Sequence, residues 1–338
     1  MTNNGIEKKN YDSIDLLKII LSVLIVQIHS DFYLPWMKPY VRLAVPLFFI
    51  ISAYFFFKKN PSTKNLLSYI KRLFILYAFW FTIFGSYFLY MNREEFIGEG
   101  DFLNGTIFFL KSLLFGSTFA ASWYITASII GTIIVFYLSR VLSNFALLVF
   151  SAIIYTITTL ATSYYGLLSD NIGLIDDWYY EITNTHLSVS FPVSIFWIVI
   201  GKLLSNNNRL QQKSILYAIL AIISLTLLQV EYSYVSVYCR LDDCFFLLVP
   251  SCICIFLLFQ SLSINIPYSG VLRNISTIVY CSHYNIISIT GMMLYVITGY
   301  TFNSFEKFFL GIIGAGIISV CIIYLERLKS FSWLKYSH

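Results

Sequence analysis

The sequence predicts an all-α membrane protein, a polytopic bundle of about ten transmembrane helices with both termini in the cytoplasm. Hydrophobic residues make up 58% of the 338 positions and charged residues only 12%, whereas about a quarter of the residues in a soluble domain are charged. The apolar residues fall into ten runs of about 17 to 25 residues, the length that crosses a bilayer as a helix. The polar segments between the runs are too short for a separate core, so residues 1–338 are predicted to form a single membrane domain.

Each apolar run is interpreted as one span, because its length and its lack of charge suit the hydrocarbon core. In chain order the predicted spans are 13–33, 39–57, 69–91, 122–139, 144–165, 187–204, 214–231, 243–262, 274–298 and 304–325.

Residues 102–119 form a further apolar stretch with an ambiguous pattern. Lys111 lies near its middle, and Gly105 and Gly116 lie near its ends. This pattern favours an interfacial or re-entrant helix, with an additional span as the alternative.

The charges in the loops predict the orientation. With the N-terminus inside, fifteen of the twenty-two Lys and Arg residues fall on the cytoplasmic side, and most of the acidic residues fall in outer loops. That asymmetry follows the positive-inside rule. The net charge of +5 is explained by cytoplasmic cations beside anionic lipid headgroups, so membrane lipid is an expected partner and nucleic acid is not.

Lys18 and His29 are the candidate catalytic pair. They lie eleven positions apart in the first span, so they share one helix face about 16 Å apart along the axis. Ionisable groups inside a membrane are costly and usually mark a pathway or a site. Imidazole titrates close to neutral pH, which suits a general base; a covalent acyl carrier and a purely structural histidine are the alternatives.

Other polar residues of the spans have two interpretations each. Arg42 could bind an anionic acceptor or stabilise an oxyanion, or it could snorkel to the interface. Ser52 and Tyr54 could contact substrate or could link helices, and Trp123 could line a pocket or anchor the chain at the interface. His283 lies in mid-membrane and needs partners or a cavity.

The remaining candidates receive ordinary interpretations. Asp15 lies one turn before Lys18 and is expected to pair with it. His186 and His338 are expected to be solvated, and the cysteines to be apolar fillers without a metal site.

Several motifs along the chain match one known family. They are the segment 14–18, His29, the segment 42–54 with its Phe-Phe-Ile-Ile-Ser-Ala-Tyr end, Lys71-Arg72, Trp123-Tyr124, Gly201-Lys202 and Ser276-x-x-x-Tyr280-x-x-His283. The chain resembles the acyltransferase-3 family of integral membrane O-acyltransferases from end to end. It departs at Ala53, Ile75 and Tyr284, where the family usually has glycine, arginine and proline. It is also similar to the membrane domain of the vancomycin-resistance serine racemase, a branch of the same superfamily thought to move serine.

The resemblance implies an activity and its partners. It implies transfer of an acyl group, commonly acetyl from cytoplasmic acetyl-CoA, to a hydroxyl of an extracytoplasmic glycan of the cell envelope, by a multi-pass protein of the bacterial plasma membrane. A second copy of the chain, in a homo-oligomer, is a further candidate partner. Lys58, Lys71 and Arg72 then form a positive patch for the donor phosphates, with Lys18 at its mouth. A small-solute, serine-like transporter remains the alternative.

Overall fold

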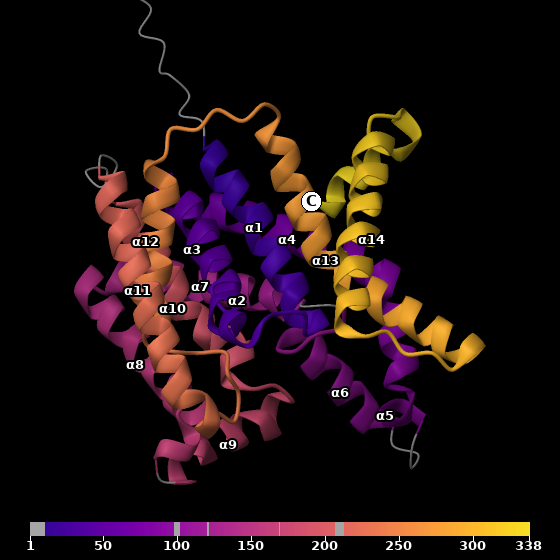
Figure 1. Ribbon diagram of the computed structural model, residues 1–338, viewed down its shortest axis with the longest axis horizontal. Coiled ribbons are helices and arrows are strands. Elements are labelled where there is room, and N and C mark those ends of the chain that lie inside the picture. The colour runs from indigo at the N-terminus through magenta and orange to yellow at the C-terminus, as the bar shows by residue number, and fades with distance from the viewer. Residues whose placement is uncertain (1–10, 98–101, 120–121, 169, 207–212) are drawn as a thin grey trace, which may run out of the picture.

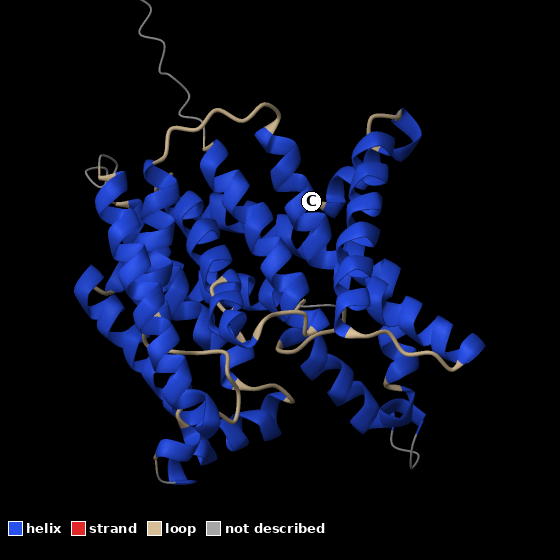
Figure 2. Cartoon of the chain, viewed as in Figure 1, coloured by secondary structure: helices blue, strands red, loops and turns tan. Residues whose placement is uncertain are grey.

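The computed structural model describes residues 11–97, 102–119, 122–168, 170–206 and 213–338, which fold into helices joined by loops, with no strand among them (Figures 1 and 2). The helices are α1 (Asp12–Ser30), α2 (Lys38–Val41), α3 (Ala44–Phe57), α4 (Thr63–Met91), α5 (Arg93–Ile97), α6 (Phe102–Leu114), α7 (Trp123–Val141), α8 (Asn144–Thr162), α9 (Gly173–Thr183), α10 (Phe191–Ser205), α11 (Ser214–Val235), α12 (Leu248–Ser261), α13 (Ser269–Thr298) and α14 (Ser304–Leu325). The predicted polytopic helical bundle is therefore confirmed.

Each of the ten predicted spans coincides with a helix, but the helices differ in length. In the described part of the chain, seven spans are long and apolar enough to cross a membrane. The helix α13 has 30 residues, whereas α10 and α12 have 15 and 14. At about 1.5 Å per residue, the two short helices are shorter than the hydrocarbon core is thick, which is roughly 30 Å.

The short helices begin later than predicted for identifiable reasons. Pro192 occupies the first turn of α10, a position that favours helix initiation. At α12, the carboxylate of Glu231 on α11 accepts hydrogen bonds from the backbone N–H groups of Phe246 and Leu247, at 2.7 and 2.8 Å. Such a carboxylate satisfies donors that a helix start leaves unpaired. The predicted starts at 187 and 243 were therefore too early for α-helix.

The helix α10 lies in the middle of the bundle and packs against α3, α7 and α8. Its contact with α3 depends on Gly201, because a Cβ at that position would lie 2.6 Å from the carbonyl oxygen of Ile50 and 2.7 Å from the Cβ of Ala53. Small residues of this kind let helix backbones approach closely in membranes. The glycine of the Gly201-Lys202 motif thus has a packing role.

The bundle has two ends, named here from the predicted orientation. The inner end holds the start of α1 and the loop between α12 and α13, at the top of Figure 1, and the outer end holds α5 and α9, at the bottom. The helix α6 lies at the outer end. It has 13 residues, too few to span, and the Nζ of Lys111 donates to the carbonyl oxygen of Glu181 on α9 at 2.9 Å. Both observations favour the interfacial interpretation of residues 102–119.

Cysteine labelling in intact cells tests the orientation. We expect Lys213→Cys to react only with reagents that reach the cytoplasm and Asp177→Cys to react from outside, because both positions are exposed and follow the positive-inside assignment. Asp176→Cys is the matched control, since the side chain of Asp176 is fully buried and should react from neither side. Labelling of position 213 from outside would reverse the assignment.

Candidate active site

Two histidines from distant parts of the chain meet between α1 and α13. The ring centroids of His29 and His283 are 5.2 Å apart, and the ring of Tyr284 lies 5.2 Å from His29. His29 is partly exposed, and in the segments that the structure describes neither of its ring nitrogens takes part in a hydrogen bond. The imidazole is therefore free to exchange a proton with a ligand.

His283 is held in one orientation. Its Nδ1 lies 2.8 Å from the carbonyl oxygen of Val279, so this nitrogen carries a proton and donates it. In the neutral ring Nε2 is then an acceptor, and it is buried without a hydrogen-bond partner among the described residues. A buried polar atom left unpaired is costly, which marks the contact between the two rings as a place for a ligand or a proton.

Aromatic side chains of α3, α7 and α13 form a cluster that includes Tyr280, three residues before His283 on α13. The hydroxyl of Tyr124 lies 3.2 Å from the Oγ of Ser52, and its ring lies 4.5 Å from Phe49 and 5.4 Å from Tyr280. Trp123 is half-buried, 6.2 Å from Phe49. Ser52 and Trp123 were both predicted to contact substrate. In this structure the hydroxyl of Ser52 and the ring of Trp123 instead belong to one cluster that links α3 and α7.

The inner end gathers cations around Lys18. The predicted ion pair is present, with Lys18 Nζ 3.1 Å from Asp15 Oδ1, and the same ammonium lies 5.7 Å from the ring centroid of Phe55. Arg72 on α4 is close enough to act electrostatically on Lys18. Arg72 therefore belongs to the same cationic group as Lys18. Its neighbour Lys71 is exposed, as is Arg72 itself.

Lys58 and Tyr54 form a second polar group at the inner end. Lys58 Nζ donates to the hydroxyls of Tyr11 and Tyr54, in the latter case at 2.9 Å, and Gln260 also bonds to Tyr54. Tyr54 is 2% exposed. Its hydroxyl is thus engaged between α3 and α12, which favours the helix-linking interpretation over direct contact with substrate.

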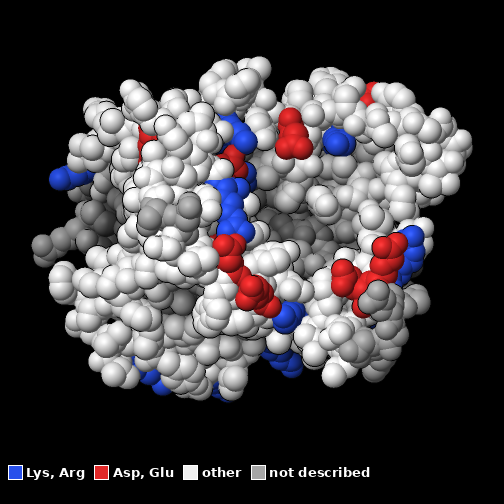
Figure 3. Space-filling view, turned by 90° about the horizontal axis from the view of Figure 1, so that it is seen from below, with Lys and Arg blue, Asp and Glu red and all other residues white. Residues whose placement is uncertain are grey.

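The outer end carries a charge-balanced network. The guanidinium of Arg42 pairs with Asp242 and, at 2.7 Å, with Asp243, and Lys38 Nζ lies 2.7 Å from Asp242. Burial by itself would raise the pKa of Asp242, but Arg42 and Lys38 outweigh it and hold this pKa below its ordinary value. Figure 3 views this end and shows a row of cationic and anionic side chains beside a hollow in the surface.

This network changes the interpretation of Arg42. Its two cations and two carboxylates sum to zero charge, so the guanidinium is not an isolated anion-binding group. It is not a snorkelling residue either, because its charged end is in ion pairs. It still acts electrostatically on His29.

Comparison with known proteins assigns the family. The family model described as an acyltransferase domain, Acyl_transf_3, matches residues 11–325. The chain belongs to the acyltransferase-3 family. Two curated relatives from Enterococcus faecalis are each named amino-acid racemase: one is 25% identical over 270 residues, covering 76% of this chain and 36% of the relative, and the other is 28% identical over 187 residues, covering 51% and 26%. The chain thus spans about a third of these relatives or less, and no solved structure matches it.

The candidate residues lie in three groups between the two ends of the bundle. Cations at the start of α1 suit an anionic ligand, the histidine pair near its end suits proton transfer, and the neutral network beyond it suits a polar ligand from the other side. Lys18 and His29 do not touch each other, and the structure brings His283, not Lys18, to His29.

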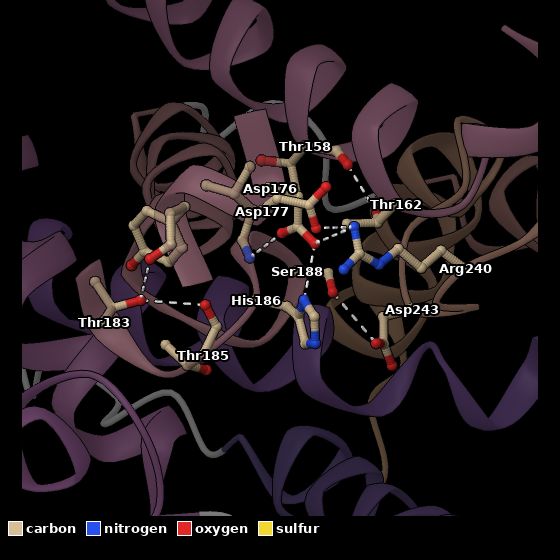
Figure 4. A network of polar contacts seen from close by, with 12 residues as sticks. Thr158, Thr162, Asp176, Asp177, Thr183, Thr185, His186, Ser188, Arg240 and Asp243 are labelled. Carbon is tan, nitrogen blue, oxygen red and sulfur yellow. Dashed lines mark hydrogen bonds and ion pairs between the residues drawn. The ribbon is translucent and has the colours of Figure 1, made fainter. Parts of the chain in front are cut away.

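A polar network on the outer side escaped the sequence analysis (Figure 4). The carboxylate of Asp176, on α9, lies 2.8 Å from Nδ1 of His186 and accepts a hydrogen bond from the backbone N–H of Leu187 at 2.9 Å. Arg240 approaches it at 3.9 Å and pairs with Asp177. The side chain of His186, predicted to be solvated, is 26% exposed, but its ring contacts the buried carboxylate of Asp176, whose burial on α9 leaves no local pattern in the sequence.

His338 was also predicted to be solvated, and the structure again differs. Its side chain is 10% exposed, and its Nε2 lies 3.4 Å from the carboxylate of Glu326. The preceding 3-10 helix Lys329–Ser337 packs against α4, where the indole of Trp80 donates to the carbonyl oxygen of Ser337 at 3.0 Å. Contact with a helix distant in sequence thus determines the environment of His338.

Proposed function

We propose that this protein is an O-acyltransferase of the bacterial plasma membrane that moves an acyl group, acetyl in the simplest case, from cytoplasmic acyl-CoA to a hydroxyl of an extracytoplasmic saccharide. The main support is the position of the histidine pair. His29 lies eleven residues along α1 from Lys18, with a cationic group at the inner end, and charged side chains border a hollow at the outer end (Figure 3). A reaction that joins substrates from opposite sides needs its base between them.

The chemistry of the step balances with His29 as the base. The acceptor hydroxyl attacks the thioester carbonyl carbon, a C–O bond forms and the C–S bond breaks. His29 takes the hydroxyl proton and returns it to the thiolate of CoA. His283, whose Nε2 lacks a partner in the described structure, can hold a proton or orient the acceptor beside it. An acyl-histidine intermediate is the alternative route with the same products.

The neutral network at the outer end bears on the acceptor. An anionic acceptor would meet the carboxylates of Asp242 and Asp243 beside the guanidinium of Arg42. A neutral polyol would meet hydrogen-bond donors and acceptors without a net charge. We therefore propose a hydroxyl-bearing acceptor without charge at the reacting residue.

Donor binding is tested by replacing the adjacent cations Lys71 and Arg72 of α4. We expect Lys71→Ala plus Arg72→Ala to weaken acetyl-CoA binding about tenfold, the effect of losing one or more charge-assisted contacts with phosphate, and to make it less salt-sensitive. Isothermal titration in nanodiscs measures this affinity.

The single variants act as matched controls for each other. Arg72→Ala should carry most of the loss, because Arg72 is close enough to Lys18 to act on it electrostatically. Equal binding by wild type and the double variant would remove both residues from the donor site.

A second candidate function is transport of a small amino acid. It is favoured by the amino-acid racemase names of the two relatives and by paired opposite charges at the outer end, which also suit a zwitterion. Flux of labelled serine into proteoliposomes without acyl-CoA would support it. Incorporation of labelled acetyl into surface glycan, lost on deletion of the gene, would support the acyltransferase.

A further inference from the structure

Arg273, in the first turns of α13, lies beside the charged residues of α1. Its Nη1 is 3.8 Å from Oδ2 of Asp15, whose other oxygen pairs with Lys18. The Oγ of Ser276, one turn further along α13, donates to the backbone carbonyl oxygen of Lys18 at 2.8 Å. This bond fixes α13 against α1 at the level of Lys18, so the position of Arg273 is built into the fold.

More positive charge surrounds the carboxylate of Asp15 than this one group can neutralise. Lys18 and Arg273 both approach it, and Arg72 and Arg273 both act electrostatically on Lys18. Lys18 and Arg273 leave about one positive charge beyond the carboxylate of Asp15, and Arg72 of α4 adds positive charge at longer range. Clustered cations with an incomplete set of counterions attract phosphate.

The two charged groups that meet Asp15 differ in depth. The side chain of Arg273 is 56% exposed, whereas that of Lys18 is 16% exposed. Arg273 therefore lies where a ligand from the cytoplasm would arrive, and Lys18 lies further inside. The guanidinium of Arg273 also presents several N–H donors, which suit phosphate oxygens better than the single ammonium of Lys18 does.

We propose that Arg273 binds a phosphate group of the acyl-CoA donor, together with Arg72, and that Asp15 is its counterion when the donor is absent. This inference rests on the proposed function, since it names a residue of the donor site. In the sequence, Arg273 is one of the fifteen cations predicted on the cytoplasmic side. A phospholipid headgroup offers the same chemistry, and the experiment separates the two sources.

The test measures binding of CoA and of pantetheine, which lacks the phosphates, to the full chain in phosphatidylcholine nanodiscs. Arg273→Gln should weaken CoA binding about tenfold and leave pantetheine binding unchanged. Arg273→Lys should keep part of the affinity because it keeps the charge. Arg140→Gln is the control, since Arg140 is a cytoplasmic-side arginine that contacts Phe136 and Thr63 instead.

Three other outcomes would contradict the inference, each for a different reason. If Arg273→Gln binds CoA as wild type does, the arginine serves lipid headgroups and the proposed function stands. If the variant loses CoA and pantetheine equally, Arg273 supports the shape of the site and not a phosphate. If wild type binds neither compound, the donor assignment fails, and the inference fails with it.

Discussion

Replacing His29 with glutamine is expected to lower acyl transfer at least about 100-fold, the lower end of what a positioned general base contributes. Glutamine keeps hydrogen-bonding groups but cannot take up a proton near neutral pH. The fold should survive, because in the described structure no hydrogen bond to the ring nitrogens of His29 is lost. Acetylated surface glycan would be measured in a deletion strain that expresses each variant at equal level.

Donor affinity separates this loss from general damage. His29→Gln and His29→Ala should both bind acetyl-CoA like wild type, because the phosphates are expected at the inner end, about 16 Å from the imidazole. Acetylation at the wild-type level in the His29→Gln strain would contradict the catalytic assignment and favour the transporter. Loss of donor binding together with activity would point to a structural histidine.

Replacing Asp176 with alanine is expected to lower the free energy of unfolding by about 3 kcal/mol, the usual cost of removing one partner from a buried charged network. The carboxylate of Asp176 is fully buried. Its loss leaves the backbone N–H of Leu187 without its acceptor and His186 and Arg240 without their shared partner. Unfolding of the purified protein in detergent, followed by circular dichroism, measures the change.

Asp177 provides a matched control on the same helix. Its side chain is 44% exposed and pairs with Arg240 at 2.5 Å, so Asp177→Ala should cost less than about 1 kcal/mol, as exposed ion pairs do. Equal effects of the two substitutions would show that the burial of Asp176 contributes nothing. The two variants together thus test whether the network of Figure 4 stabilises the outer end.

Sequence reasoning predicted the elements of this bundle well because they depend on local composition. An unpaired backbone group is so costly in lipid that a long apolar run becomes a helix, and each of the ten runs did. The 3.6-residue period likewise places Lys18 and His29 on one face, and Asp15 next to Lys18, from spacing alone. The helix starts were predicted less well: α10 and α12 begin later than their runs, where a proline and the carboxylate of Glu231 decide the first turn, α3 also begins later, and α4 and α13 begin earlier.

By itself, then, the sequence determined the family, the helices and the candidate pair on α1, all of which are properties of one segment at a time. Only the tertiary structure decided which segments meet. It placed His283 against His29, Asp242 on Arg42, Arg273 on Asp15 and Asp176 in a buried network. Lipid tails are as apolar as the helices they surround, so hydrophobicity says little about which helices pack together, and partners far apart in the chain depend on close packing and on a few polar contacts.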